Sequence, residues 1–217
     1  GLPGQHSGVP GLDRPLVPAE ITASPAGSTA RPIALIGPMA VGKSAIGHQL
    51  AHQLGAPFVD TDVVVVSTHG SIAEIFASRG EHAFRELEAR AVARAIEDAH
   101  GSNTVISLGG GAVLDSGTQQ LLEHCTVAYL ECDADTVAER IARNSGRPLL
   151  AGDAMERWKT LFATRRPVYE RLADVVLDVR TGSVQDLARR LEDALQRYAA
   201  GTPAATPAPA GTKEVEK

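Results

Sequence analysis

The stretch "GPMAVGKS" at residues 37–44 constrains the fold of this chain more than any other part of the sequence. It fills every fixed position of the pattern G-x-x-x-x-G-K-[ST], a loop whose backbone N–H groups cradle phosphate oxygens. The short apolar run "PIALIG" leads into the loop, and Ile46, Leu50 and Leu54 follow it as one stripe of a helix. A phosphate-binding loop between a strand and a helix predicts an α/β fold, with the loop at the carboxyl end of the strand.

Short apolar runs alternate with helical patterns over the rest of the core, which is typical of β-α units and a parallel sheet. Four further strands are predicted in "APFVD", "TVISL", "TVAYL" and "DVVLDV". The second strand ends at Asp60, and the third stops at a run of three glycines. We therefore predict an α/β fold, a three-layer α/β/α sandwich around a central five-stranded parallel sheet.

The segments between the strands carry distinct helix signals. Ser71 and Glu74 form a capping-box pattern at the start of "SIAEIF", and a long amphipathic helix follows. Asp133 is expected to cap the helix in "DADTVAERIAR". A further helix is expected over residues 154–172, with an interruption at Pro167 because proline removes a backbone donor.

The two ends of the chain differ in composition from its middle. Residues 1–30 are rich in Gly, Pro, Ser and Ala, and residues 201–217 read "GTPAATPAPAGTKEVEK". Neither end carries enough apolar surface to offset the entropy of ordering, so both are predicted to be disordered. One domain over residues 31–200 remains, with a lid-like loop near 144–153 where glycine and proline interrupt a helix.

Composition argues against several classes of protein. The net charge is −5, so the sequence offers no nucleic-acid surface. No apolar run approaches the roughly 20 residues that cross a bilayer, and the N-terminus does not resemble a signal peptide. We expect a cytoplasmic protein with no membrane partner, in which Cys125 and Cys132 are reduced packing residues. A monomer is the expected form, although the sequence itself is silent on oligomeric state.

Side chains suited to phosphoryl transfer are expected at the carboxyl edge of the sheet. Lys43 can reach the β- and γ-phosphates of a nucleotide, and the Ser44 hydroxyl can bind Mg²⁺. Asp60 and Asp62 lie two residues apart, and on an extended chain they would project the same way. One could hold the waters of the metal while the other meets a substrate hydroxyl. A turn that is simply rich in Asp is the alternative interpretation.

Three consecutive glycines, Gly109, Gly110 and Gly111, occupy the turn "SLGGGA". They cost backbone entropy that a turn alone rarely requires, so we expect a ligand to approach the backbone closely there. A structural turn is the alternative. Arginines near the same edge can bind a carboxylate or stabilise a moving phosphoryl group. Arg147 is the most distinctive of them because its loop could close over a nucleotide.

Together these motifs resemble the shikimate kinase family. The resemblance rests on the phosphate loop and on "FVDTD", "SIAEIFASRGEHAFRELE", "SLGGGA", "GRPLL" and "RRPVYERLAD", in this order and spacing. It implies a P-loop nucleoside triphosphate hydrolase fold like that of the nucleoside monophosphate kinases. It also implies ATP-dependent phosphorylation of the 3-hydroxyl of shikimate, a step toward chorismate and the aromatic amino acids.

The resemblance also implies a role for each matching position. Asp62 would contact the reactive hydroxyl, and Arg85 and Arg165 would clamp the shikimate carboxylate. The expected acceptor-site residues are Asp62, Phe76, Phe84, Arg85, Glu88, Gly109, Gly110, Gly111 and Arg165. The expected nucleotide-site residues are Gly37, Met39, Ala40, Val41, Gly42, Lys43, Ser44, Ala45, Arg140, Arg147 and Arg180. Arg140 would stack on adenine, Lys43 and Arg147 would act on the phosphates, and Ser44 and Asp60 would hold Mg²⁺.

This chain departs from the family pattern at two places. Many family loops carry glycine where this chain has Ala40, whose methyl group restricts the backbone if the residue needs a positive φ. We expect tolerance rather than lost activity. In "TRRPVY" two arginines are adjacent, and Arg165 keeps the R-x-P spacing, so Arg166 is the less expected clamp.

Other functions stay open at this point. Gluconate kinases and nucleoside monophosphate kinases share the loop and the general plan, although no base pocket is evident over residues 67–100. A GTP-binding switch would carry an N-K-x-D stretch, which is absent from the sequence. A binding module without catalysis would be expected to have lost Asp62, Arg85 or Arg147, and all three are present.

Overall fold

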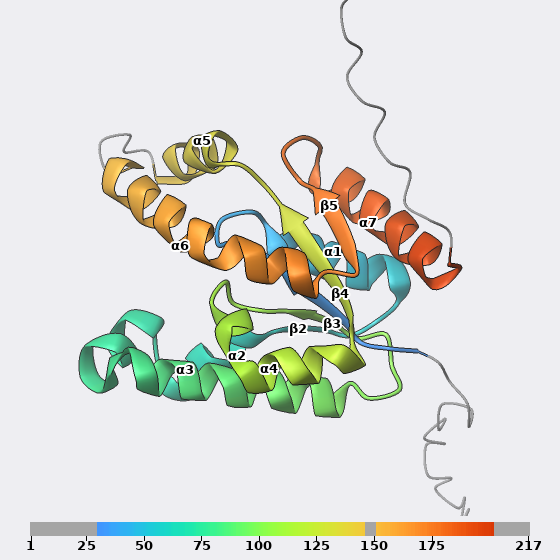
Figure 1. Cartoon of the computed structure of the whole chain (residues 1–217), viewed down its shortest axis with the longest axis horizontal. Helices are drawn as coiled ribbons and strands as arrows, with labels where there is room; N and C mark the ends of the chain where they lie inside the picture. Colours follow the sequence, from blue (N-terminus) through green and yellow to red (C-terminus); the bar gives the residue numbers. More distant parts are fainter. Residues whose placement is uncertain (1–29, 146–150, 202–217) are drawn as a thin grey trace, which may run out of the picture.

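A computed structural model describes residues 30–145 and 151–201 (Figure 1). Five parallel strands form one sheet in the order β2-β3-β1-β4-β5, which confirms the predicted fold class. The strands are β1 Ile33–Ile36, β2 Phe58–Asp60, β3 Val105–Ser107, β4 Thr126–Glu131 and β5 Val175–Asp178. Because β1 lies between β3 and β4, the loop after β1 begins where the strand order reverses, which is the usual ligand-binding crevice of such sheets.

Helices cover both faces of the sheet. They are α1 Lys43–Leu54, α2 Thr61–His69, α3 Ile72–Asp98, α4 Ser116–Leu121, α5 Ala134–Ser145, α6 Ala151–Leu172 and α7 Val184–Ala199. Figure 1 shows α3 and α4 on one side of the sheet and α1 and α7 on the other. None of the helices in the two described ranges has the length and apolar character that a bilayer span requires.

The core is divided between the two faces by the alternation of side chains along the central strand. Ile33 and Leu35 pack toward α1 and α7, whereas Ala34 and Ile36 pack toward α3 and α4. All four are buried, as expected for a strand covered on both faces. The alternation therefore anchors β1 on both sides, and it fixes the point from which the phosphate loop leaves the sheet.

The acidic pair lies differently from the extended arrangement that we predicted. Asp60 ends β2 and caps α2, its Oδ1 accepting from the backbone N–H groups of Asp62 at 3.0 Å and Val63 at 3.3 Å. Asp62 therefore lies in the first turn of a helix, and the prediction of an extended chain is wrong. These two N–H groups at the start of α2 would otherwise lack a partner. Their hydrogen bonds to Asp60 therefore stabilise the change from strand to helix at this point.

The predicted interruption at Pro167 is also wrong. Helix α6 runs unbroken from Ala151 to Leu172. A proline inside a helix costs about 3 kcal/mol or more because one hydrogen bond is missing. Buried aromatic side chains on both sides of it, Trp158 and Tyr169, anchor the two halves of α6 in the core.

The two predicted caps are confirmed, and one helix contains a kink. Ser71 and Glu74 form a capping box at the start of α3, and Asp133 Oδ1 accepts from the N–H of Thr136 at 2.8 Å at the start of α5. Gly80 interrupts α3 with φ 84° and ψ 168°. The kink separates a short first segment of α3 from the long segment that carries several of the predicted acceptor-site residues.

Candidate functional site

The phosphate loop after β1 is built from backbone conformations that favour glycine. Gly37 has φ 145° and Gly42 has φ 92°, and a Cβ on Gly37 would lie 2.7 Å from the Leu130 carbonyl oxygen. Ala40 also has a positive φ, 65°, and it is the one non-glycine residue in the described ranges that does. The sequence-based concern about this alanine is therefore justified, because its methyl group occupies a position that glycine adopts at lower cost.

Lys43 opens α1 and turns back over the loop. Its buried Nζ donates to the carbonyl oxygens of Gly37 at 2.8 Å and Pro38 at 2.7 Å. Burial lowers the pKa of Lys43 to about 8, against the opposing effect of Asp62 and Asp60. An anionic ligand such as a phosphate would stabilise the charged form of this lysine. The backbone N–H groups of the loop would bind the same anion.

Ser44 and Asp60 form an oxygen pair next to this lysine. The Ser44 hydroxyl donates to Asp60 Oδ2, while the other oxygen of the same carboxylate caps α2. The structure thus brings together the two residues that we predicted as metal ligands. A hydroxyl and a carboxylate are hard oxygen donors of the kind that Mg²⁺ prefers.

The three glycines after β3 lie at the centre of the charged side chains. A Cβ on Gly109 would lie 2.7 Å from Asp62 Oδ1 and 2.8 Å from Glu88 Oε2, and a Cβ on Gly111 would overlap the Arg85 guanidinium. None of the three glycines has a positive φ. Space, and not backbone conformation, therefore requires glycine here. The bare backbone lets charged groups from three helices meet at one turn.

Two of the predicted clamp residues meet at this turn. Arg85 Nη1 donates to Glu88 Oε1 at 2.9 Å, and the Arg85 guanidinium lies 5.3 Å from the centroid of the Phe84 ring. Arg165, from α6, is 6% exposed, and its Nη1 would lie 3.2 Å from a Cβ on Gly110. The Nε of Arg165 is buried without a hydrogen-bond partner in the described part of the chain. A buried guanidinium with an unsatisfied donor favours binding of an anion.

The two carboxylates beside these arginines are held in a partly dry environment. Burial raises the pKa of Asp62, and Asp60 raises it further, while Lys43 and Arg85 oppose the shift. Burial also raises the pKa of Glu88, and Arg85 opposes that shift. A carboxylate whose pKa is raised is a stronger base once it is ionised, which suits proton transfer from a hydroxyl.

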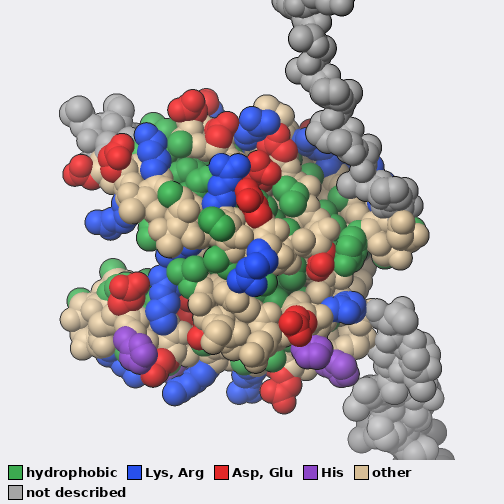
Figure 2. Space-filling view, in the orientation of Figure 1, with side chains coloured by type: hydrophobic (Ala, Val, Ile, Leu, Met, Phe, Trp, Pro, Cys, Tyr) green, Lys and Arg blue, Asp and Glu red, His purple; other side chains and the backbone are tan. Residues whose placement is uncertain are grey.

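Aromatic side chains from both segments of α3 lie next to the charged groups. The rings of Phe76 and Phe84 contact each other with centroids 5.1 Å apart, across the kink at Gly80. Phe84 is buried, whereas Phe76 is 38% exposed. The space-filling view shows the surface hollowed between α6 and α3, with basic side chains along the hollow (Figure 2).

A second cavity lies on the other side of the phosphate loop. It measures about 490 Å³ and is lined by loop residues including Ala40 and Val41, by Arg140 from α5, and by the start of α7. Arg140 donates to the carbonyl oxygens of Val41 at 3.1 Å and Val179 at 2.6 Å, so its guanidinium is fixed at the cavity wall. Arg180 lies outside this lining and instead pairs with Asp178 at 2.7 Å.

Helix α6 contributes two contacts that the sequence did not indicate. Trp158 Nε1 donates to the Met39 carbonyl oxygen at 2.9 Å, and the Tyr169 hydroxyl donates to the Gly110 carbonyl oxygen at 2.6 Å. Burial raises the pKa of Tyr169 to about 12, so the hydroxyl stays protonated. The spacing of Trp158, Phe162 and Tyr169 along one face was the available signal, but it is typical of plain core packing.

Some predicted site residues lie outside the described ranges, and two others lie exposed at the start of a helix. Arg147 and the central part of the lid-like segment, residues 146–150, are among the residues that the structure does not describe, as are residues 1–29 and 202–217 of the predicted tails. Ser44 and Ala45 are exposed at the start of α1, where free backbone donors point out of the helix. The roles of all the predicted site residues stay predictions.

A glycine loop between a buried strand and a helix, a lysine over that loop and a hydroxyl–carboxylate pair beside it define a P-loop nucleotide-binding protein. The chain belongs to the shikimate kinase family, whose model matches residues 39–196. It is 41% identical over 165 residues to the shikimate kinase of Streptomyces coelicolor, covering 76% of this chain and 95% of that protein. It is 45% identical over 143 residues to that of Rhodococcus jostii, covering 65% and 83%.

Solved structures agree with this assignment. The shikimate kinase from Acinetobacter baumannii in complex with shikimate superposes with a TM-score of 0.69 and 29% identity, covering 78% of this chain and 94% of the other. A gluconokinase from Sinorhizobium meliloti gives a TM-score of 0.54 at 18% identity, which shows only that the fold is shared. Family membership therefore separates shikimate kinase from the gluconate kinase alternative.

Proposed function

We infer that this chain transfers the γ-phosphoryl group of ATP to the 3-hydroxyl of shikimate and releases shikimate 3-phosphate and ADP. One observation supports the proposal above all others: the buried Arg165, with its unpartnered Nε, lies beside Arg85, Asp62 and Glu88 at the glycine turn next to the phosphate loop. Shikimate is a small carboxylic acid that also carries hydroxyl groups. A pair of guanidinium groups suits its carboxylate, and a carboxylate suits its reactive hydroxyl.

In this proposal the acceptor lies over the three glycines. Arg85 and Arg165 bind the shikimate carboxylate, and the pairing of Arg85 with Glu88 holds that guanidinium in place. Phe76 and Phe84 form the apolar wall beside it. Such a fixed orientation supplies much of the rate enhancement in phosphoryl transfer, where positioning and charge neutralisation are the main requirements.

Asp62 and Lys43 act on the reacting groups. Asp62 orients the acceptor hydroxyl and accepts its proton, a role that its raised pKa favours. Lys43 gives up the carbonyl oxygens of Gly37 and Pro38 and binds the phosphates instead, because a phosphate is a better partner for an ammonium group than two peptide carbonyls. The phosphoryl group then passes from ATP to the hydroxyl between these two side chains.

The nucleotide occupies the phosphate loop and the cavity beside it. Backbone N–H groups of the loop after Pro38 bind the phosphates, and Arg140 offers the face of its guanidinium to adenine at the cavity wall. Ser44 and Asp60 would hold Mg²⁺, and the metal would neutralise charge on the transferred phosphate. Arg147, which lies outside the described residues, is proposed to act on the same phosphates.

The proposal can be tested with purified protein, MgATP and separate additions of shikimate, gluconate and AMP, following the release of ADP. Rapid turnover is expected with shikimate alone. Turnover with gluconate or AMP and none with shikimate would overturn the assignment. The panel is needed because the phosphate loop by itself is common to all three kinds of kinase.

The adjacent arginines of α6 provide a matched pair of variants. Arg165 is buried beside the glycine turn, whereas Arg166 is exposed and pairs with Glu170 at 2.8 Å. Arg165→Lys keeps the charge but loses the fork that binds a carboxylate with two hydrogen bonds, so KM for shikimate should rise by about tenfold or more. Arg166→Lys should leave it unchanged. Equal effects of the two variants would remove the basis for the acceptor site.

A further inference from the structure

The single tryptophan of the chain ties helix α6 to the phosphate loop. Trp158 is 3% exposed, stacks on Phe162 with ring centroids 4.8 Å apart, and donates from Nε1 to the Met39 carbonyl oxygen at 2.9 Å. The side chain of Met39 is 55% exposed, so Met39 gains little from burial of its own side chain. At this point the loop depends on a contact with a helix that lies 119 residues further along the chain.

The direction of that contact determines where the next backbone donor points. Met39 and Ala40 share one peptide plane, and no peptide bond in the described ranges is cis. In a trans peptide the C=O and N–H groups point in opposite directions, so fixing the Met39 carbonyl toward α6 aims the Ala40 N–H away from α6. This is the peptide that leads into the strained residue of the loop, with φ 65° at Ala40. Such a conformation persists only where the surroundings hold it.

The other side-chain contacts of the loop do not all persist when a nucleotide binds. Lys43 donates to the carbonyl oxygens of Gly37 and Pro38, and a bound phosphate would compete with them for the same ammonium group. Arg140 holds Val41, beyond the strained residue. The indole N–H carries no charge, so a bound phosphate does not attract it away from the Met39 carbonyl oxygen as it attracts an ammonium group. It therefore remains as the side-chain contact that holds the middle of the loop.

We propose that Trp158 is a positioning residue of the nucleotide site: its indole N–H fixes the Met39–Ala40 peptide so that the Ala40 N–H faces the phosphates of a bound nucleoside diphosphate or triphosphate. The inference rests on the proposed function only for the identity of the ligand. Trp158 acts through the backbone and touches neither nucleotide nor acceptor. Its effect is therefore expected on nucleotide affinity and not on shikimate affinity.

The experiment removes the N–H group and keeps the aromatic ring. Because the chain has one tryptophan, expression with β-(3-benzothienyl)alanine in place of tryptophan replaces only this indole N–H by sulfur. Trp158→Phe provides a second, genetically encoded version. Calorimetric titration with MgADP should show a dissociation constant raised by about three- to tenfold in both proteins, the usual effect of one lost hydrogen bond. Titration with shikimate should give a dissociation constant within twofold of the parent value.

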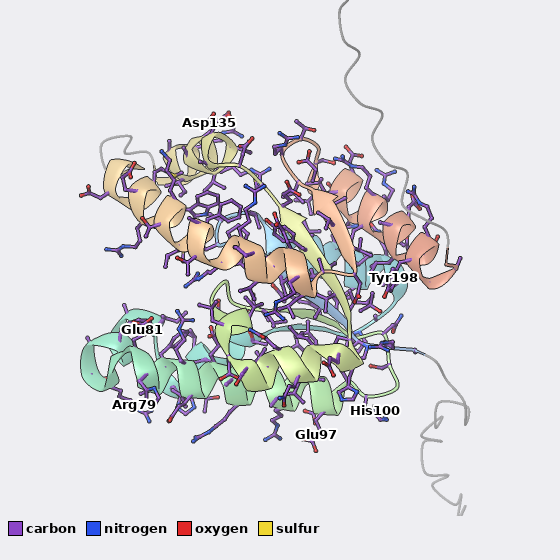
Figure 3. All side chains as sticks on the ribbon, in the orientation of Figure 1. Arg79, Glu81, Glu97, His100, Asp135 and Tyr198 are labelled. Atoms are coloured by element: carbon purple, nitrogen blue, oxygen red, sulfur yellow. The ribbon has the colours of Figure 1, made fainter. Side chains whose placement is uncertain are left out.

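Tyr198→Phe is the matched control, since it also deletes one aromatic donor. The Tyr198 hydroxyl donates to Asp174 Oδ1 at 3.1 Å, and Figure 3 shows Tyr198 at the end of α7, far from the start of α6. MgADP affinity should be unchanged in this variant. Its thermal unfolding midpoint should fall by no more than the midpoints of the two Trp158 proteins. The midpoint and the MgADP dissociation constant of each protein can then be compared.

Two results would overturn the proposal. One is an unchanged MgADP dissociation constant in the benzothienylalanine protein, which would show that the N–H does not position the loop. The other is a joint fall in MgADP affinity, shikimate affinity and thermal midpoint, which indicates a structural role alone. The binding comparison needs no turnover, so a protein that binds MgADP but does not phosphorylate shikimate would refute the proposed function and still decide the role of Trp158.

Discussion

Replacing Gly109 by alanine places a methyl group between the two carboxylates of the acceptor site. The new Cβ would lie 2.7 Å from Asp62 Oδ1 and 2.8 Å from Glu88 Oε2, whereas ordinary contact begins at 3.4 Å. Glu88 is buried and held by Arg85 at 2.9 Å, so its carboxylate resists displacement. Asp62, which is less buried, is expected to move by about 0.7 Å to restore contact distance.

The size of the effect follows from this displacement. A misplacement of about 1 Å in a reacting group can cost about a hundredfold in rate, so Gly109→Ala should lower kcat by about 10- to 100-fold. Overpacking of this kind costs about 1–3 kcal/mol of folding free energy. The atoms that crowd Gly109 belong to the two acidic side chains and not to the phosphate loop. KM for ATP is therefore expected to stay within about twofold of the parent value.

Steady-state kinetics at saturating shikimate, with a thermal melt of each variant, provides the assay. Gly117→Ala is the control, because its Cβ would meet only the Asp115 carboxylate, at 3.2 Å in the first turn of α4. It should turn over like the parent. If Gly109→Ala also kept a parental kcat while its melting temperature fell, the position of Asp62 would not govern the rate and the proposed base would be wrong.

Three further predictions concern single groups. Asp62→Asn removes the proton acceptor and should lower kcat by about a hundredfold or more while calorimetric MgADP affinity stays close to parental; near-normal turnover would contradict its role. Nucleotide affinity should fall as pH rises above about 8, because burial lowers the pKa of Lys43 to about 8 and only the charged amine pairs with phosphate; equal dissociation constants at pH 7 and pH 9 would exclude this. Ala40→Gly should raise the melting temperature by about 1–4 °C: relief of the positive φ, about 1–2 kcal/mol, exceeds the added flexibility of the unfolded chain, about 0.4–1 kcal/mol. A lower melting temperature would contradict the assigned strain.

The sheet and the phosphate loop could be predicted from the sequence because their signals are local. A buried strand, a glycine loop and a helical stripe follow one another within residues 33–54, and hydrophobic periodicity marks the remaining strands. The start of α2 was harder to predict from the sequence. Asp60 and Asp62 fit a strand end by alternation, and only the hydrogen bonds from the Asp62 and Val63 N–H groups to Asp60 show that the helix begins at once.

The resemblance of motifs placed the charged residues of the acceptor site, but it could not show why three glycines stand there. The expected reason was approach of a ligand to the backbone. The structure adds that Gly109 and Gly111 leave room for the side chains of Asp62, Glu88 and Arg85. That crowding depends on α3 and α2 meeting β3, and no local pattern in "SLGGGA" indicates it.

The contacts of α6 were missed for a different physical reason. A hydrophobic pattern marks Trp158, Phe162 and Tyr169 as one apolar face, but it treats each ring as uniformly apolar. Trp and Tyr each carry a hydrogen-bond donor at the edge of an otherwise apolar ring, and burial obliges that donor to find an acceptor. Here the acceptors are backbone carbonyls of two separate loops, at Met39 and Gly110.

The same obligation favours the continuation of α6 past its proline. Trp158 donates to the phosphate loop and Tyr169 donates to the glycine turn, so a bend at Pro167 would break one contact or the other. Arg165 lies on the face between them, seven residues after Trp158 and four before Tyr169, close to the helical repeat of 3.6. One rigid helix thus sets the distance between the phosphate loop and the glycine turn. In-line transfer between two substrates requires that distance to be fixed.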